Sequence, residues 1–83
     1  MKQETLLERI IVDPKVMIGK PVIKGTRLAV QYILKLHSQG MTIDEILQEY
    51  EGLTREDILA CYLFASKALE DSSFVPLYVG NYK

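Results

Sequence analysis

The chain has 83 residues, of which 48% are hydrophobic and 25% charged, a composition typical of one folded domain and not of a disordered tail. It contains no run of 18 apolar residues and no apolar segment near its start that would serve as a signal peptide. We therefore expect no membrane partner and a cytoplasmic location. Residues 1–27 carry a net charge of +3 and residues 28–83 a net charge of −4, so attraction to phosphate is expected in the first third of the chain.

Residues 1–29 are predicted to form an N-terminal arm of strands and turns. The segment Arg9–Asp13 is short and rich in β-branched residues, which predicts a strand that ends at Pro14. After a loop, Pro21–Ile23 is predicted to be a second extended segment. In the turn that follows, Gly25 supplies a backbone conformation that other residues resist.

Residues 30–70 are predicted to form a three-helix domain. Apolar residues recur with a helical period over Val30–Gln39, and Gly40 follows in the position that ends helices. A second helix is predicted over Ile43–Tyr50, and a third begins at Thr54 and continues to residue 69 or 70. The fold class is therefore mostly α, with a short N-terminal strand segment before a three-helix bundle.

The same helix-start signal occurs twice in this domain, twelve residues apart. Thr42 is followed three residues later by Glu45, and Thr54 by Asp57, so each pair is placed to form a reciprocal capping box. A turn that contains Gly52 separates the two helices, which predicts a helix-turn-helix of homeodomain-like or winged-helix-like form. Such a unit presents a helix to DNA, but it also occurs in bundles that bind no DNA, and geometry alone does not separate the two.

The apolar surface of the third helix is too wide for a single stripe, which predicts that a second surface covers it. We expect that surface to belong to another copy of the chain, in a homodimer. Cys61 lies inside this stretch and is expected to be buried as a small hydrophobic residue. The residues of the helix that are expected in the interface are Tyr62, Phe64, Ala65 and Leu69.

Residues 71–83 form an apolar tail, in which Phe74, Leu77 and Tyr78 are further candidates for an interface. In one interpretation the tail folds over the helices of its own chain or of its dimer partner and completes a small core. In the other it is a binding segment that becomes ordered on a protein partner. The sequence leaves both open.

The sequence gives little support for catalysis. His37 has the spacing of a core or edge residue in the first predicted helix, and no nucleophile and base are arranged as a recognisable pair. No cluster of cysteine and histidine has the spacing of a metal site, and the acidic residues of the second and third helices are explained by capping and by the helix dipole. We therefore expect no catalytic residue, no metal and no cofactor.

The segment Lys20–Arg27 is the most promising polar site, because it places three cations within eight residues. The turn at Gly25 and Thr26 is able to aim backbone amides at an anion, with Lys20, Lys24 and Arg27 around it. A tight turn with solvated flanking charges explains the same residues. The first turn of the third helix adds Arg55, but the two acidic residues that follow it would oppose a phosphate.

These motifs resemble those of the small prokaryotic proteins of domain-of-unknown-function family 433. The resemblance is carried by I-G-K-P-V-I-K-G-T-R-L-A-V, by G-M-T-I-D-E-I-L and by L-T-R-E-D-I, and it covers residues 10–68. It implies a helix-turn-helix preceded by a strand segment, in proteins that act as antitoxin-like partners of small nuclease toxins of the PIN type. It places Lys24, Thr26 and Arg27 in the signature turn, and residues 54–58 at the third helix. Where many members have Ile-Pro after the arginine, this chain has Leu28-Ala29, which frees the backbone N–H of residue 29.

Two functions then compete, and a third is disfavoured. The first is an antitoxin-like regulator that binds duplex DNA as a dimer and a PIN-type toxin through its C-terminal part. The second is a helical protein-binding adaptor without affinity for DNA, which the acidic helices favour. An enzyme is the least favoured.

Overall fold

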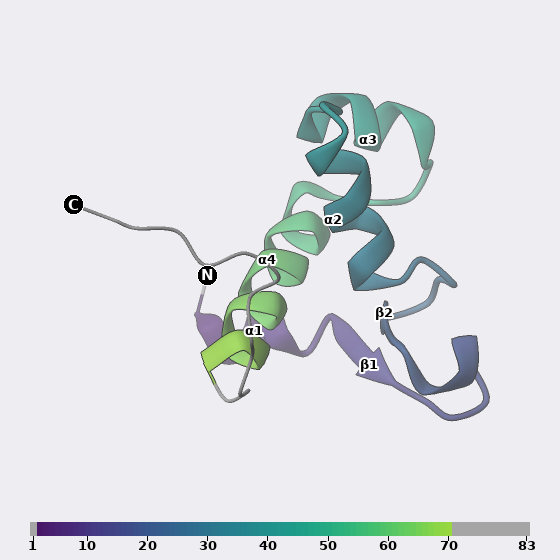
Figure 1. The fold of residues 1–83 in the computed structure, drawn as a ribbon, viewed down its shortest axis with the longest axis vertical. Helices are drawn as coiled ribbons and strands as arrows, with labels where there is room; N and C mark the ends of the chain where they lie inside the picture. The colour runs from purple at the N-terminus through teal and green to yellow at the C-terminus, as the bar shows by residue number, and fades with distance from the viewer. Residues whose placement is uncertain (1, 71–83) are drawn as a thin grey trace, which may run out of the picture.

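The computed structural model describes residues 2–70 (Figure 1). The predictions for Phe74, Leu77 and Tyr78 lie outside these residues. Within residues 2–70 the protein is a small, mostly helical domain that begins with a short helix, followed by a two-stranded hairpin. The elements in chain order are α1 (Gln3–Leu7), β1 (Ile10–Val12), the 3₁₀ turn η1 (Met17–Gly19), β2 (Pro21–Ile23), α2 (Val30–Ser38), α3 (Ile43–Glu49) and α4 (Arg55–Glu70).

The two predicted extended segments pair with each other. Strands β1 and β2 are antiparallel, with Ile10 opposite Ile23 and Val12 opposite Pro21. Ile10 and Ile23 are buried, whereas Val12, at the end of β1, is 58% exposed. The hairpin is extended by a bond from the backbone N–H of Lys24 to the carbonyl of Arg9, at 2.7 Å.

The predicted turn after β2 is confirmed and is held by its own side chain. Gly25 has a φ of +83°, a left-handed conformation that suits glycine. The backbone N–H of Thr26 donates to the carbonyl of Ile23 at 3.0 Å, and the Thr26 hydroxyl donates to the same carbonyl at 2.7 Å. That hydroxyl also accepts from the N–H of Leu28 at 3.0 Å. Ala29 then forms an isolated bridge with Val22, so the chain returns along β2 before it enters α2.

The three helices predicted in residues 30–70 are all present, and both capping boxes are formed. The N–H of Glu45 donates to the Thr42 hydroxyl at 3.1 Å, and the N–H of Thr42 donates to the Glu45 carboxylate at 2.9 Å. The N–H of Asp57 donates to the Thr54 hydroxyl at 3.2 Å, and the N–H of Thr54 donates to the Asp57 carboxylate at 3.0 Å. Helix α2 ends before Gly40, whose φ is +102°.

Helix α4 connects the parts of the domain. It contacts α1, α2, α3 and β1. In Figure 1 α3 lies at one end of the molecule and α1 at the other, with α2 and α4 between them. The buried apolar side chains that form the core around α4 are Ile10, Ile23, Val30, Ile33, Ile46, Ile58, Ala60 and Cys61.

Cys61 is fully buried, as predicted, and behaves as a small core residue. Burial, with a smaller contribution from the nearby charge of Asp57, raises the pKa of its thiol to about 12. The neutral thiol is therefore the form present at physiological pH.

The prediction that residues 1–29 hold only strands and turns was incomplete, because α1 lies within them. Five residues are too few for a stable isolated helix, so α1 depends on packing. It packs along α4: Leu6 contacts the core, and Leu7 lies in a hollow beside Phe64. The two adjacent leucines show no helical period, which explains why the sequence pattern did not reveal the helix.

Candidate functional site: a basic hairpin and an apolar groove

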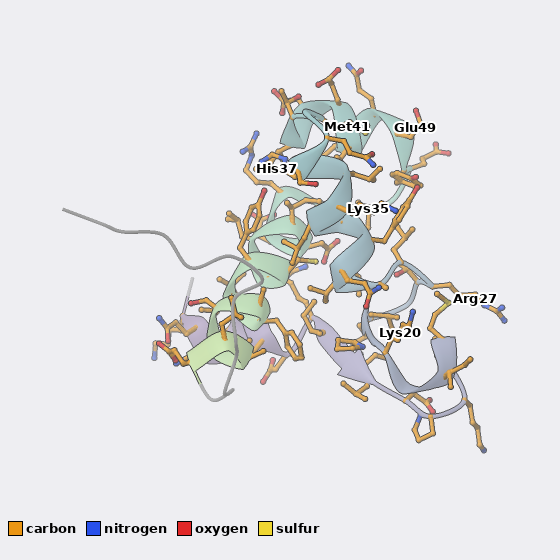
Figure 2. All side chains as sticks on the ribbon, in the orientation of Figure 1. Lys20, Arg27, Lys35, His37, Met41 and Glu49 are labelled. Carbon is orange, nitrogen blue, oxygen red and sulfur yellow. The ribbon has the colours of Figure 1, made fainter. Side chains whose placement is uncertain are left out.

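Three exposed cations lie around β2: Lys20 precedes the strand, Lys24 follows it directly, and Arg27 lies in the turn that comes next. In residues 2–70 none of the three has an acidic partner. Figure 2 shows Lys20 and Arg27 at the hairpin end of the molecule, and Lys35 of α2 lies on the same side in this view. The structure therefore leaves all three cations of the predicted basic segment exposed, at either end of β2 and in the turn beyond it.

The backbone of the turn contributes less to anion binding than the sequence suggested. The amides of Lys24, Thr26 and Leu28 all donate to acceptors within the chain. The Thr26 hydroxyl is engaged as both donor and acceptor, so its role is to hold the turn. Gly25 makes the turn possible through its positive φ. An anion at this turn would therefore be bound mainly by the lysine and arginine side chains.

Arg55 is placed differently from the hairpin cations. Its Nη2 atom lies 3.0 Å from Oδ1 of Asp44, and this ion pair joins the first turns of α4 and α3 on an exposed surface. Exposed pairs of this kind contribute about 0–1 kcal/mol and break readily. Arg55 is thus available to a ligand only after it leaves Asp44, in a neighbourhood that is otherwise acidic.

A polar pocket that the sequence did not reveal lies between α1, the hairpin and α4. Its volume is about 330 Å³, and Thr5, Glu8, Arg9, Lys24 and Asp57 line it. The Arg9 Nη1 atom lies 3.1 Å from Asp57 Oδ1, with both side chains half-buried, and the Arg9 Nε atom is buried without a partner. Arg9 and Asp57 are 48 positions apart, and the pattern of each segment gave no sign of this contact.

An apolar groove runs between α2 and the C-terminal half of α4, beside β2. Its volume is about 300 Å³. Three of the predicted interface residues lie in it, and one of them, Leu69, is 63% exposed. A second hollow of about 400 Å³ lies on the other side of Phe64, against Leu7 and Ile10. The residues that line the groove are Pro21, Val30, Gln31, Leu34, Phe64, Ala65, Ala68 and Leu69.

Tyr62, the fourth predicted interface residue of α4, does not line this groove. Its ring lies 5.5 Å from the ring of His37, centre to centre, and holds the end of α2 against α4. The Tyr62 hydroxyl and the His37 Nδ1 atom are both buried without a hydrogen-bond partner. Burial raises the pKa of Tyr62. His37 is thus a half-buried packing residue, in keeping with the edge position expected from its spacing.

A pair of tyrosines that the sequence analysis did not single out joins α2 to the end of α3. The hydroxyls of Tyr32 and Tyr50 are 2.6 Å apart, and the rings meet edge to face. The hydrogen bond to Tyr32 is the main cause of a raised pKa at Tyr50. Neither a cluster of metal-binding side chains nor a helix long and apolar enough to cross a membrane occurs in the described part of the chain.

Comparisons with known proteins agree with this arrangement of elements. Residues 10–65 match a family described as protein of unknown function (DUF433), a region that begins at β1 and ends within α4. An uncharacterized protein of Archaeoglobus fulgidus is 53% identical over 32 residues, which are 39% of this chain and 89% of that protein. The crystal structure of a DUF433 member from Anabaena variabilis superposes with a TM-score of 0.73 at 31% identity. That match covers 81% of this chain and 66% of the other, so this chain spans about two thirds of that relative.

Proposed function

This chain belongs to the DUF433 family, and from that premise we propose that it is an antitoxin-like regulator which binds duplex DNA as a dimer and a PIN-type nuclease as its protein partner. The observation that supports DNA binding is the group of Lys20, Lys24 and Arg27 around β2, exposed and forming no ion pair within residues 2–70. The partner function follows from the role that the family resemblance implies.

The hairpin is suited to phosphate because its position is fixed. The turn that follows β2 is closed by Thr26, and the bond between Lys24 and Arg9 ties the end of β2 to the segment that contacts α4. Cations on an already ordered backbone segment contact phosphates without the cost of ordering that segment, and such contacts set the position of a protein on DNA. Binding through this hairpin would be largely independent of base sequence and strongly dependent on salt.

Helices α3 and α4 supply the helix-turn-helix of the proposal, with Gly52 at a φ of +93° in the turn between them. The first turn of α4 carries Glu56 and Asp57, and Arg55 is already paired with Asp44. We therefore assign most of the phosphate contacts to the hairpin and not to Arg55. The acidic first turn would disfavour deep entry of α4 into a groove of DNA.

Anisotropy titrations of labelled duplex DNA test this assignment. The double substitution Lys24→Glu plus Arg27→Glu should weaken binding more than Arg55→Ala does. Each phosphate contact that is lost should lower the slope of log K against log salt by about 0.9. The matched control is Lys2→Glu plus Lys67→Glu, which changes the net charge equally at exposed positions outside the segment Lys20–Arg27. Weakening by Arg55→Ala alone would reverse the assignment.

A protein-binding adaptor without DNA affinity is the second candidate. The exposed acidic residues at the start of α3 and α4 favour it, because they repel phosphate and occupy Arg55. Absence of duplex binding at about 50 mM salt, where electrostatic binding is strong, would favour the adaptor. Co-purification with a PIN-type nuclease encoded by an adjacent reading frame would support the antitoxin-like role.

A further inference from the structure

The loop that joins β1 to β2 presents apolar side chains to solvent. Ile18 is 93% exposed and Met17 is 42% exposed, and Val12 at the end of β1 also faces outwards. We call Val12, Met17 and Ile18 the hairpin tip. Scattered exposed apolar residues are ordinary, but Met17 and Ile18 are adjacent in one loop, and neighbouring exposed apolar side chains are typical of a contact surface.

The backbone of the hairpin tip is held in a strained conformation. Met17 has a φ of +51° and Ile18 a φ of +55°, in the left-handed region that β-branched residues avoid. The loop is kept in place by bonds from the N–H of Val16 to the Asp13 carbonyl at 2.9 Å and from the N–H of Lys20 to the Met17 carbonyl at 3.1 Å. Within the described residues the Ile18 side chain gains almost no burial in return for this strain.

The apolar groove between α2 and α4 offers a matching surface. A cavity of about 150 Å³ is enough to hold a benzene molecule, so a groove of about 300 Å³ has room for the side chains of Met17 and Ile18. Pro21 lines the groove and follows η1 closely in the chain, so the hairpin tip and the groove border each other. Because Ile18 is almost fully exposed, it does not fill the groove of its own chain.

We infer that two copies of the chain pair by reciprocal insertion, each placing the hairpin tip that contains Met17 and Ile18 into the α2–α4 groove of the other. The inference rests on the homodimer of the proposed function and names its contact surface. Since tip and groove adjoin on one face, a two-fold axis brings both contacts together in one self-complementary interface.

Charge supports a second copy as the occupant. The exposed residues Lys15 and Lys20 flank the hairpin tip. The groove ends at the C-terminus of α4, where Glu70 is exposed and the helix dipole is negative. Lys67 also lies in this last turn, but it lines the separate hollow beside Leu7 and Ile10. Insertion therefore brings cations of one copy to the negative helix end of the other.

Substitutions that introduce opposite charges at the hairpin tip and in the groove test this pairing. Ile18→Glu and Ala65→Lys should each raise the dimer dissociation constant at least about 100-fold in sedimentation experiments, because each removes two apolar contacts per dimer. A mixture of the two variants should recover a heterodimer with an affinity within about tenfold of the wild type, since opposite charges attract where apolar contacts were lost. In that heterodimer the introduced glutamate of one copy would meet the introduced lysine of the other, and the second tip and groove remain native. The double variant Ile18→Glu plus Ala65→Lys, in which both contacts become Glu–Lys pairs, should dimerise more tightly than either single variant.

The controls keep folding separate from pairing. Leu59→Glu replaces another exposed apolar residue and Ser66→Lys adds a charge beside the groove, yet neither position lines it, so both variants should dimerise normally. Circular dichroism should report the same helix content for every variant.

A wild-type monomer at tens of micromolar would overturn both the proposed dimer and this inference. A dimer that tolerates Ile18→Glu, or weakened variants that do not recover when mixed, would leave the proposed dimer standing and overturn the inference. The groove would then belong to another occupant, such as residues 71–83.

Discussion

The Arg9 guanidinium and the Asp57 carboxylate join the N-terminal arm to the start of α4, with Nη1 and Oδ1 3.1 Å apart. The other carboxylate oxygen of Asp57 accepts the backbone N–H of Thr54 at 3.0 Å. The main-chain carbonyl of Arg9 accepts the N–H of Lys24 at 2.7 Å. One acidic side chain thus caps α4 and fixes the position of the hairpin that carries the basic residues.

Removal of this carboxylate should destabilise the domain. Asp57→Ala eliminates both the helix cap and the partner of Arg9, so we expect the free energy of unfolding to fall by about 2 kcal/mol. Thr54→Ala, which removes only the hydroxyl of the cap, should cost about 1 kcal/mol. Glu51→Ala, at an exposed position in the preceding turn, should change it by less than about 0.5 kcal/mol. Urea unfolding followed by circular dichroism measures all three.

A double-mutant cycle with Arg9→Ala isolates the contact between the arm and the helix. Contacting charged residues of this kind should show a coupling energy above about 0.5 kcal/mol. A coupling indistinguishable from zero would mean that Asp57 acts only as a cap, and that Arg9 does not hold the hairpin.

Glu45 should make stability depend on pH. Hydrogen bonds from Thr42 lower the pKa of Glu45 below the ordinary value of 4.5, with the bond from the Thr42 backbone N–H as the larger cause and the bond from its side chain as the smaller. A carboxyl group whose pKa is lower in the folded state stabilises that state above the pKa of the unfolded chain. The contribution is lost as the pH falls below about 4.5 and through the lower pKa of the folded protein.

Glu45→Gln should therefore have a lower melting temperature than the wild type near pH 7, with a gap that closes as the pH falls below about 4.5. Glu49→Gln on the same exposed helix is the matched control and should leave the pH profile of the wild type unchanged. A gap that persists unchanged at low pH would show that the charge of Glu45 does not carry the effect of the capping box.

Local signals in the sequence were sufficient for α2, α3, α4 and the two strands. The capping boxes at Thr42 and Thr54 involve atoms within three residues of each other, and Gly25 and Gly40 mark a turn and a helix end by their backbone freedom. Such features depend on neighbours along the chain, so they are visible before the fold is known.

The features that the sequence did not reveal depend on contacts between distant residues. Helix α1 is stabilised because Leu6 and Leu7 pack against other parts of the fold, and the Arg9–Asp57 ion pair forms only when the hairpin and α4 are assembled. The breadth of the apolar surface of α4 was readable from the sequence, and part of that surface lines the groove beside α2. The sequence did not show which of these residues pack within the chain and which line the groove. Only the fold shows that Tyr62 packs on His37 while Ala65 lines the groove.

Cys61 should be unreactive in the folded protein. It is fully buried and its pKa is raised to about 12, so neither access nor ionisation favours attack by its sulfur on a disulfide reagent. At about pH 8, below the ordinary pKa of a thiol, it should react with such a reagent only as fast as the protein opens. Ser66→Cys places a thiol at an exposed position on the same helix and should react at once. Rapid labelling of Cys61 in the native wild type would contradict its burial.

Relief of strain at Ile18 should raise the stability of the monomer while it weakens the proposed dimer. Glycine adopts a φ of +55° freely, whereas the left-handed conformation costs other residues about 1–2 kcal/mol. After the greater entropy of glycine in the unfolded chain is subtracted, Ile18→Gly should increase the free energy of unfolding by about 0.5–1 kcal/mol. The loss of the side chain costs the monomer little, because Ile18 is 93% exposed. Unfolding must be measured at a concentration at which the protein is monomeric, since dimerisation itself adds apparent stability.

Ile18→Ala separates the two effects of this substitution. Alanine removes most of the apolar side chain but keeps a Cβ atom, so it should weaken the dimer as glycine does without the gain in monomer stability. A destabilised Ile18→Gly monomer would show that the left-handed backbone at this position is not a source of strain. If both variants dimerise as tightly as the wild type, the hairpin tip does not lie in the interface. If the strained backbone of Ile18 is tolerated because its side chain contacts a second copy, Ile18→Gly should shift the two quantities in opposite directions. The fold should become more stable and the dimer weaker.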